Sequence, residues 1–216
     1  MNYNIDHNRK TRIGFPEVIY GESKDVATLC NILEETLKHS PNALLTKLQE
    51  EKYLKIKDKF KNVFYDLKSG ICIVGNLTKN KKRNPDIIIL SGGTSDEFVV
   101  NEAYYTAEFL GLKAKKIIDV GVAGVHRLLD RKEEINKAKV LIVCAGFEGA
   151  LPTVVGGLFP QPIIAVPISI GYGVAKGGHT ALNSMLSSCA NGLLVTNIDN
   201  GYGAAIAAYR IVKGLR

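Results

Sequence analysis

Four side chains that can do chemistry stand close to glycines or turns in this sequence. Cys189 lies in SSCANGLLVTN, Glu148 in AGFEGALP, Asp96 in SGGTSD and His126 in VHRLLD. A thiolate is a strong nucleophile, and carboxylates or an imidazole accept and donate protons. By their types alone, Cys189 is a candidate nucleophile, and Glu148, Asp96 and His126 are candidate acid–base groups.

Each member of this set also has a structural interpretation. Cys189 continues an apolar stripe at helical spacing, which is typical of core packing. The stripe consists of Leu182, Met185, Leu186 and Cys189. Asp96 and Glu148 stand where a loop enters a helix, so each is either a helix cap or a functional carboxylate. The functional role is a base or cation ligand for Glu148, and a ribose or cation ligand for Asp96. His126 is either catalytic or a structural histidine of an amphipathic helix.

Small residues and glycines surround these positions and predict a substrate-binding edge. Two glycines in SGGTSD let the backbone approach a ligand closely, and Thr94 or Ser95 is expected to cap the next helix and leave N–H donors for a phosphate. The expected binding residues are Ser91, Gly92, Gly93, Thr94, Ser95, Gly146, Gly149, Ala150, Gly171, Tyr172, Gly173, Asp199 and Asn200. Neither G-x-x-x-x-G-K-[ST] nor G-x-G-x-x-G is present, which disfavours P-loop and ordinary dinucleotide-binding Rossmann chemistry.

The elements that position these loops repeat five times as strand, loop and helix. The strands are nearly continuous β-branched runs, as in a parallel sheet covered on both faces. They are predicted at 86–90, 115–120, 139–144, 162–167 and 192–197, with helices at 97–111, 125–137, 153–158, 179–189 and 204–214. The fold class is therefore α/β, a doubly wound parallel sheet in a flavodoxin-like three-layer sandwich, over residues 83–216.

Residues 1–82 predict a small α+β domain before this sheet. A helix is expected at 25–39, and short strands at 17–20, 43–48, 62–67 and 70–75, with the last two forming a hairpin.

Composition excludes several classes of protein. The chain of 216 residues has a net charge of +7, but its lysines alternate with apolar or acidic residues, which favours a solvated face over a nucleic-acid site. No apolar run could span a bilayer, and the polar N-terminus lacks a signal core, so we expect a cytoplasmic protein without a membrane partner. Cys30, Cys72 and Cys144 have apolar neighbours and are predicted to be buried. The four histidines show no pair at metal-ligand spacing.

The strand-end loops together resemble the AIR carboxylase (PurE-like) domain of purine biosynthesis. The whole chain resembles the LarB family still more closely, whose carboxylases make the precursor of the nickel-pincer nucleotide cofactor. The motifs that carry this resemblance are RIGFPEVIYG, GFEGALPTVVGG, PISIGYGVAKGG and NSMLSSCANGLLVTNIDNGYGA. The chain departs from the family's usual residues at Asn101, Phe147, Lys176 and His179, and the roles of Lys176 and His179 stay open.

The LarB resemblance implies a substrate and a reaction. Nicotinic acid adenine dinucleotide is carboxylated by CO2 at pyridinium C5, and its phosphoanhydride is hydrolysed to release AMP. The other product is pyridinium-3,5-biscarboxylic acid mononucleotide. Mg2+ or another divalent cation is expected to assist, with no organic cofactor and with metal ligands unknown. The family's cysteine matches Cys189 and its acidic residues match Asp96 and Glu148, whereas His126 matches the histidine of AIR carboxylases.

The resemblance also implies a homo-oligomer, an octamer, with sites near subunit contacts. Two other functions stay open at this point. One is an AIR carboxylase or mutase acting on an aminoimidazole ribonucleotide. The other is a non-catalytic nucleotide-binding protein, because a fold does not fix a function.

Overall fold

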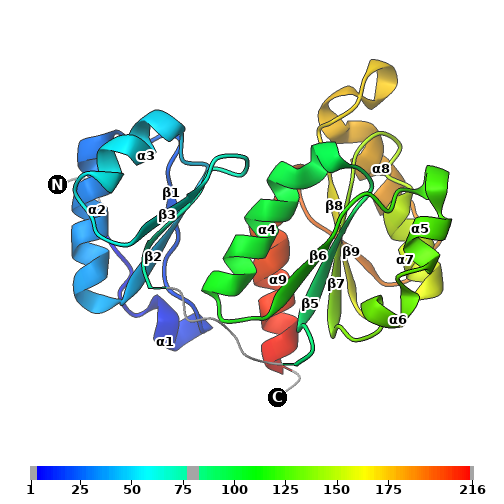
Figure 1. Cartoon of the computed structure of the whole chain (residues 1–216), viewed down its shortest axis with the longest axis horizontal. Coiled ribbons are helices and arrows are strands. Elements are labelled where there is room, and N and C mark those ends of the chain that lie inside the picture. The colour runs from blue at the N-terminus through cyan, green and yellow to red at the C-terminus, as the bar shows by residue number, and fades with distance from the viewer. Residues whose placement is uncertain (1–3, 77–82, 215–216) are drawn as a thin grey trace. The chain divides into compact units, whose positions relative to one another are not determined.

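A computed structural model of the chain describes residues 4–76 and 83–214. The chain divides into two compact units, Met1–Lys79 and Asn80–Arg216. The predicted domain boundary, between residues 82 and 83, adjoins the segment 77–82, which lies outside the described residues. Each unit has its own sheet (Figure 1) and its own hydrophobic core.

The N-terminal unit is the predicted α+β domain. Its four-stranded sheet has the order β1-β2-β4-β3, and the expected hairpin is the antiparallel pair β3–β4. The elements are α1 (Arg9–Ile13), β1 (Ile19–Tyr20), α2 (Val26–His39), β2 (Asn42–Thr46), α3 (Glu50–Lys57), β3 (Val63–Asp66) and β4 (Ile71–Gly75). Helix α2 begins at an Asp25 cap, whose carboxylate accepts a hydrogen bond from Thr28 N, and it buries Leu29, Ile32 and Leu33 against the sheet.

The C-terminal unit is the predicted doubly wound α/β sheet, and the fold-class prediction is confirmed. Its five parallel strands have the order β6-β5-β7-β8-β9. The strands are β5 (Ile87–Ser91), β6 (Ala114–Ile117), β7 (Val140–Ala145), β8 (Ile163–Pro167) and β9 (Leu193–Val195). The helices and 3-10 turns are η1 (Thr94–Asp96), α4 (Glu97–Phe109), η2 (Val122–Gly124), α5 (His126–Leu129), α6 (Lys132–Ile135), α7 (Leu151–Leu158), η3 (Gly173–Gly178), α8 (His179–Leu186) and α9 (Gly201–Gly214).

Helices cover both faces of this sheet. In Figure 1, α4 and α9 lie on one face and α5 to α8 on the other. The central strands β5, β7 and β8 are wholly buried, which explains their unbroken apolar sequences. Helices α4 and α9 approach closely because residue 201 is a glycine: a Cβ there would lie 2.4 Å from the carbonyl oxygen of Val99.

Two predicted helices differ from the structure. The run 125–137 forms two short helices, α5 and α6, separated at Asp130 and Arg131, where the backbone of Arg131 leaves the helical region. The run 179–189 ends as a helix at Leu186, so Cys189 lies in the following connection.

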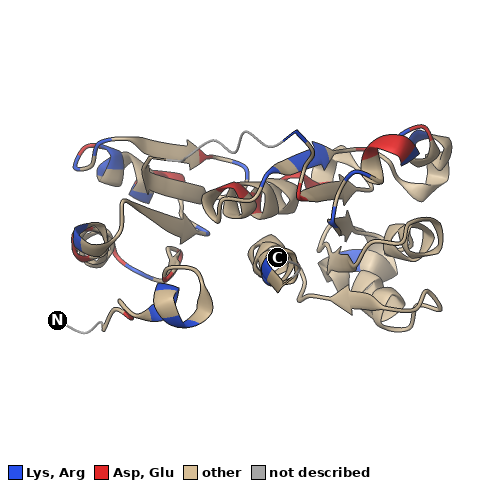
Figure 2. Cartoon of the chain, turned by 90° about the horizontal axis from the view of Figure 1, so that it is seen from below, with Lys and Arg blue, Asp and Glu red and all other residues tan. Residues whose placement is uncertain are grey.

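Among the described residues, no helix has the length and apolar character needed to cross a membrane. Figure 2 shows basic and acidic segments in both units, although part of the C-terminal unit carries few charged residues.

Candidate active site

The loops that follow β5, β6 and β7 enclose a cavity at the carboxyl edge of the parallel sheet. The strand order reverses at β5: the connection after β5 leads to β6 on one side, and the next strand, β7, lies on the other side. Open α/β sheets bind ligands at such a switch point. The cavity has a volume of about 230 Å³. Its lining residues are Gly92, Gly93, Ser95, Asp96, Gly121, Val122, Ala123, Arg127, Ala145, Gly146, Phe147, Glu148, Ala150 and Leu151.

The loop after β5 turns its carboxylate inward. Asp96 is 3% exposed, and its Oδ2 atom accepts a hydrogen bond from Gly93 N at 2.9 Å. Burial raises the pKa of Asp96, although the backbone hydrogen bonds oppose that shift. The predicted cap by Thr94 or Ser95 is wrong: residues 94–96 form the turn η1, and α4 begins without a side-chain cap. Asp96 instead fixes the turn that precedes the helix.

The loop after β7 carries the second carboxylate. Phe147 and Gly149 both have positive φ, 52° and 67°, and the Phe147 N–H donates to the carbonyl of Ile170 at 3.0 Å. This backbone holds Glu148 at the cavity with its side chain exposed. The Glu148 carboxylate has no hydrogen-bond or ion-pair partner among the described residues, and α7 begins without a side-chain cap. Glu148 is therefore not the helix-capping carboxylate of the structural interpretation.

The loop after β6 also lines the cavity, although none of its residues is among the predicted binding residues. A Cβ at Gly121 would lie 2.6 Å from the carbonyl oxygen of Gly92, so glycine there lets the two loops meet. Arg127 of α5 also lines this cavity, and its NH1 atom pairs with Asp119 Oδ2 at 2.6 Å. The sequence contains a signal for this loop, since GVAG directly follows a predicted strand, whereas the resemblance points to His126 rather than to its neighbour Arg127.

Arg127 also borders a second and larger hollow of about 650 Å³. Basic side chains from β6 and α5–α6 contribute to it together with three carboxylates. Its polar lining consists of Lys115, Lys116, Asp119, Arg127, Asp130, Arg131 and Glu134. Arg127 is thus the charged residue that lines both hollows.

Several other predicted binding residues support the loops rather than line the cavity. The Ser91 hydroxyl is buried and donates to the carbonyl of Gly93 at 3.0 Å. Asp199 Oδ1 accepts from Ser169 N at 2.9 Å, and Asn200 Oδ1 accepts from Gly203 N at 2.7 Å, at the start of α9. Thr94 lies in η1 but does not line the cavity.

The remaining predicted residues lie around Phe147 and α8. The ring of Tyr172 packs edge to face against the ring of Phe147, with the ring centroids 5.4 Å apart, so Tyr172 contacts a residue that lines the cavity. The neighbouring Gly171 and Gly173 do not line the cavity. Gly149 packs against α8, where a Cβ would lie 2.8 Å from the Cα of Ala181. His126 is exposed and does not line the cavity, although it adjoins Arg127; Lys176 and His179 are also exposed.

Cys189 lies in the connection between α8 and β9 and does not line the cavity of this chain. Its neighbours attach that connection to α7: Ser188 Oγ lies 2.7 Å from Thr153 Oγ1, and Ala190 packs against Gly156. All four cysteines are within the described residues, and only Cys189 is exposed. The predicted burial of Cys30, Cys72 and Cys144 is confirmed, and core packing is wrong for Cys189.

Comparisons with known proteins agree with this architecture. The family model for the LarB/PurE-like N-terminal domain matches residues 2–76, and the model for AIR carboxylase matches residues 86–214. The chain is 38% identical over 216 residues to Uncharacterized protein MJ0165 of Methanocaldococcus jannaschii, covering 97% of this chain and 83% of that protein.

Solved PurE structures share the fold of the C-terminal unit. A single-substitution variant of PurE2 from Treponema denticola is 23% identical, with a TM-score of 0.50, over 62% of this chain and 82% of that one. The AIR carboxylase match indicates an enzyme of the carboxy-lyase type. With both domain models matched in this order, the chain belongs to the LarB family, as its motifs predicted.

Proposed function

We propose that this protein carboxylates nicotinic acid adenine dinucleotide at pyridinium C5 and hydrolyses its phosphoanhydride, releasing AMP and pyridinium-3,5-biscarboxylic acid mononucleotide. The observation that carries the proposal is the exposure of Cys189, in contrast to the burial of the three other cysteines. A thiol that serves only as a core filler is normally buried. An exposed thiol within the family's motif is instead available to a substrate.

The chemistry explains why this substrate requires a thiol. A pyridinium ring is electron-poor and does not attack CO2. Addition of the Cys189 thiolate at C4 breaks the ring's aromaticity and makes C5 an enamine carbon, which then forms a bond to CO2. A base removes the C5 proton, and the electron pair of that C–H bond re-forms the ring double bond as the C4–S bond breaks. The Cys189 thiolate is regenerated when it leaves, so Cys189 acts as a catalyst.

Glu148 is the proposed base for the C5 proton. Its carboxylate is exposed at the cavity and has no protein partner among the described residues, so it is free to accept a proton. Asp96 is held by the Gly93 N–H and is buried, which suits it to orienting a ribose hydroxyl or a cation. Arg127, between the two hollows, is proposed to contact the phosphoanhydride, since a guanidinium binds phosphate oxygens in pairs.

The residues at the cavity fit a divalent cation such as Mg2+. Mg2+ prefers oxygen ligands and is commonly held by one or two carboxylates together with substrate phosphates. Asp96 and Glu148 are the carboxylates that line the cavity; Asp96 would hold the ion there together with substrate oxygens, which leaves Glu148 as the proposed base. When bound, Mg2+ would offset the negative charge of the phosphoanhydride.

The proposed site takes Cys189 from one copy of the chain and the cavity from another. Cys189 does not line the cavity of its own chain, so a homo-oligomer, proposed to be an octamer, would bring the two together. The AIR carboxylase match favours a second candidate, carboxylation of an aminoimidazole ribonucleotide, whose reacting carbon is already an enamine carbon and needs no thiol.

Product analysis distinguishes these candidates. The protein is incubated with bicarbonate, Mg2+ and either nicotinic acid adenine dinucleotide or aminoimidazole ribonucleotide, and the products are identified by mass spectrometry. We expect AMP and a biscarboxylated mononucleotide from the dinucleotide. Carboxylation of the aminoimidazole alone would replace the proposal by the second candidate, and no turnover of either would leave a nucleotide-binding protein.

A further inference from the structure

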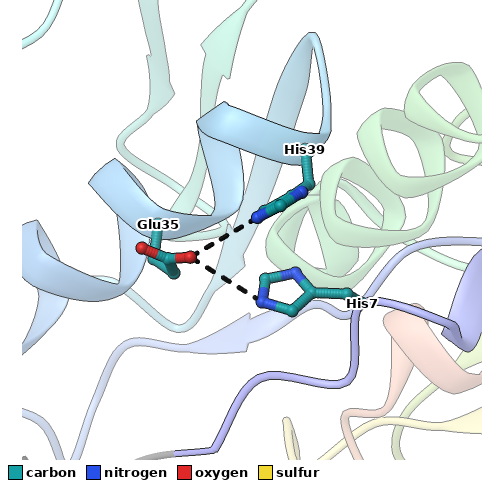
Figure 3. Close-up of side chains that lie close together, drawn as sticks. All are labelled: His7, Glu35 and His39. Atoms are coloured by element: carbon teal, nitrogen blue, oxygen red, sulfur yellow. Dashed lines mark ion pairs between the residues drawn. The ribbon is translucent and has the colours of Figure 1, made fainter.

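The N-terminal unit contains a cluster of two histidines and a glutamate that the proposed reaction does not use. Glu35 and His39 lie one turn apart on α2, and His7 comes from the segment before α1 (Figure 3). The three ligand atoms all lie within 4.8 Å of one another. Among the residues described here, this is the one group of three or more metal-ligating side chains placed so closely.

The three side chains converge on a single oxygen atom. His39 Nε2 lies 3.4 Å and His7 Nε2 lies 3.9 Å from Glu35 Oε1. Four tetrahedral ligands with bonds of about 2.0–2.2 Å lie about 3.3–3.5 Å from one another. The His39 distance already has this value, and the His7 distance needs a closure of a few tenths of an ångström. The two histidine side chains are 39% and 54% exposed, so rotation within the cluster is open to both.

A lysine beside the cluster binds the other carboxylate oxygen. Lys38 Nζ lies 2.8 Å from Glu35 Oε2 and leaves Oε1 to the histidines. The hydrogen bond from Lys38 lowers the pKa of Glu35, which favours the ionised carboxylate. The imidazole rings pack with their centroids 4.2 Å apart, at 50°.

Space for a fourth ligand lies beside the rings. His7 and His39 line a cavity of about 210 Å³ together with polar side chains from the N-terminal segment and the end of α2. Water reaches such a cavity, and a site with three protein ligands takes water in its fourth position.

We propose that His7, Glu35 and His39 bind one divalent transition-metal ion of the zinc type, with water as the fourth ligand. Imidazole nitrogen selects zinc and its first-row neighbours over Mg2+ and Ca2+, which prefer oxygen. The ion would tie the N-terminal segment to α2. This site lies in a different unit from the cavity described above, and the proposal is independent of the reaction proposed there.

Titration of the full-length, metal-free protein with Zn2+ in competition with a chromogenic chelator tests this site. We expect one Zn2+ per chain, visible absorption bands of a tetrahedral ion when Co2+ replaces it, and no displacement by excess Mg2+. His7→Ala and His39→Ala are each expected to weaken Zn2+ binding at least about tenfold. His179→Ala is the matched control, because His179 is also exposed but lies in α8, and its affinity is expected to equal that of the native protein.

Zn2+ is also expected to raise the unfolding temperature of the native protein and of His179→Ala, but not of a His7→Ala/His39→Ala double variant, because only a folded site binds the ion. Circular dichroism confirms that each variant is folded. Native-like Zn2+ affinity in both single variants would overturn the proposal, as would displacement by Mg2+ or absence of binding by the native protein.

Discussion

The loops around the cavity and the connection that carries Cys189 are built in different ways within the same unit. The loops are held by backbone contacts: Gly121 lies against Gly92, Phe147 has a positive φ, and Asp96 is buried beneath the turn that it fixes. The connection after α8 is attached to α7 by Ser188, and its thiol is exposed. One chain therefore preorganises a binding cavity but does not place the proposed nucleophile in it. The predictions below test whether chemistry and binding are divided in this way.

The largest expected effect is that of Cys189→Ser. Serine is nearly isosteric with cysteine, but its hydroxyl is far less acidic and a poorer nucleophile toward a pyridinium ring. We expect carboxylation to fall by about three orders of magnitude or more, while the dinucleotide still binds. The measurements are product formation by mass spectrometry and binding by calorimetry. The dihydropyridine-like near-ultraviolet absorbance expected on mixing native protein with substrate should be absent from the variant.

Cys144→Ser is the matched control. Cys144 is fully buried in β7, and burial raises the pKa of its thiol well above the usual value, so it is not a nucleophile. A buried hydroxyl in its place is expected to cost about 1–3 kcal/mol of stability, with turnover per folded molecule unchanged. Native-like carboxylation by folded Cys189→Ser would refute the adduct mechanism.

A mixing experiment gives the next largest effect and tests the division between copies. Cys189→Ala and Glu148→Gln are each expected to be inactive alone. If Cys189 and Glu148 of one site come from different copies, then random co-assembly of equal amounts restores about one quarter of the sites. The chains are mixed under dissociating conditions and reassembled, and the specific activity is compared with native protein treated identically.

Reassembly of each variant by itself is the control for that experiment. Activity that stays absent in the mixture, although light scattering shows mixed oligomers, would place both residues in the same copy. Cys189 would then have to reach the cavity of its own chain by a movement of the α8–β9 connection. A fully active monomer would exclude the proposed oligomer altogether.

Much of the fold could be predicted from the sequence, because the central strands of the C-terminal unit are continuous apolar runs and glycines follow each of its five strands. The predicted strands overlap β1 to β9 in both units, and the loops after β5 and β7 line the cavity as expected. The two carboxylates of the cavity could be found because each closely follows a predicted strand. Helix ends could be predicted less well, since α8 stops at Leu186 although apolar spacing continues to Cys189.

What could not be predicted depends on contacts between distant residues. His7 and His39 are far apart in the sequence, so no spacing rule pairs them, although Glu35 and His39 stand at i and i+4. Arg127 follows His126 directly in α5, and no pattern in VHRLLD indicates that Arg127 lines the cavity while His126 does not. The buried state of Asp96 follows from the packing of three loops rather than from its place in SGGTSD.

The smallest expected effect concerns Asp96 and the pH dependence of stability. Burial raises the pKa of Asp96 above its ordinary value of 3.8, so the unfolded chain releases this proton before the folded chain does. The free energy of unfolding is therefore expected to decrease as the pH rises from about 4 through the folded-state pKa of Asp96. At pH values above that pKa, Asp96 causes no further decrease. Asn at this position still accepts the Gly93 N–H through its carbonyl oxygen but does not titrate, so Asp96→Asn removes that decrease.

Urea unfolding of the native protein and the variant at a series of pH values measures the difference. Parallel profiles for Asp96→Asn and the native protein would show that the loops do not hold this carboxylate in a dry environment, and would weaken the contrast between a preorganised cavity and an exposed thiol.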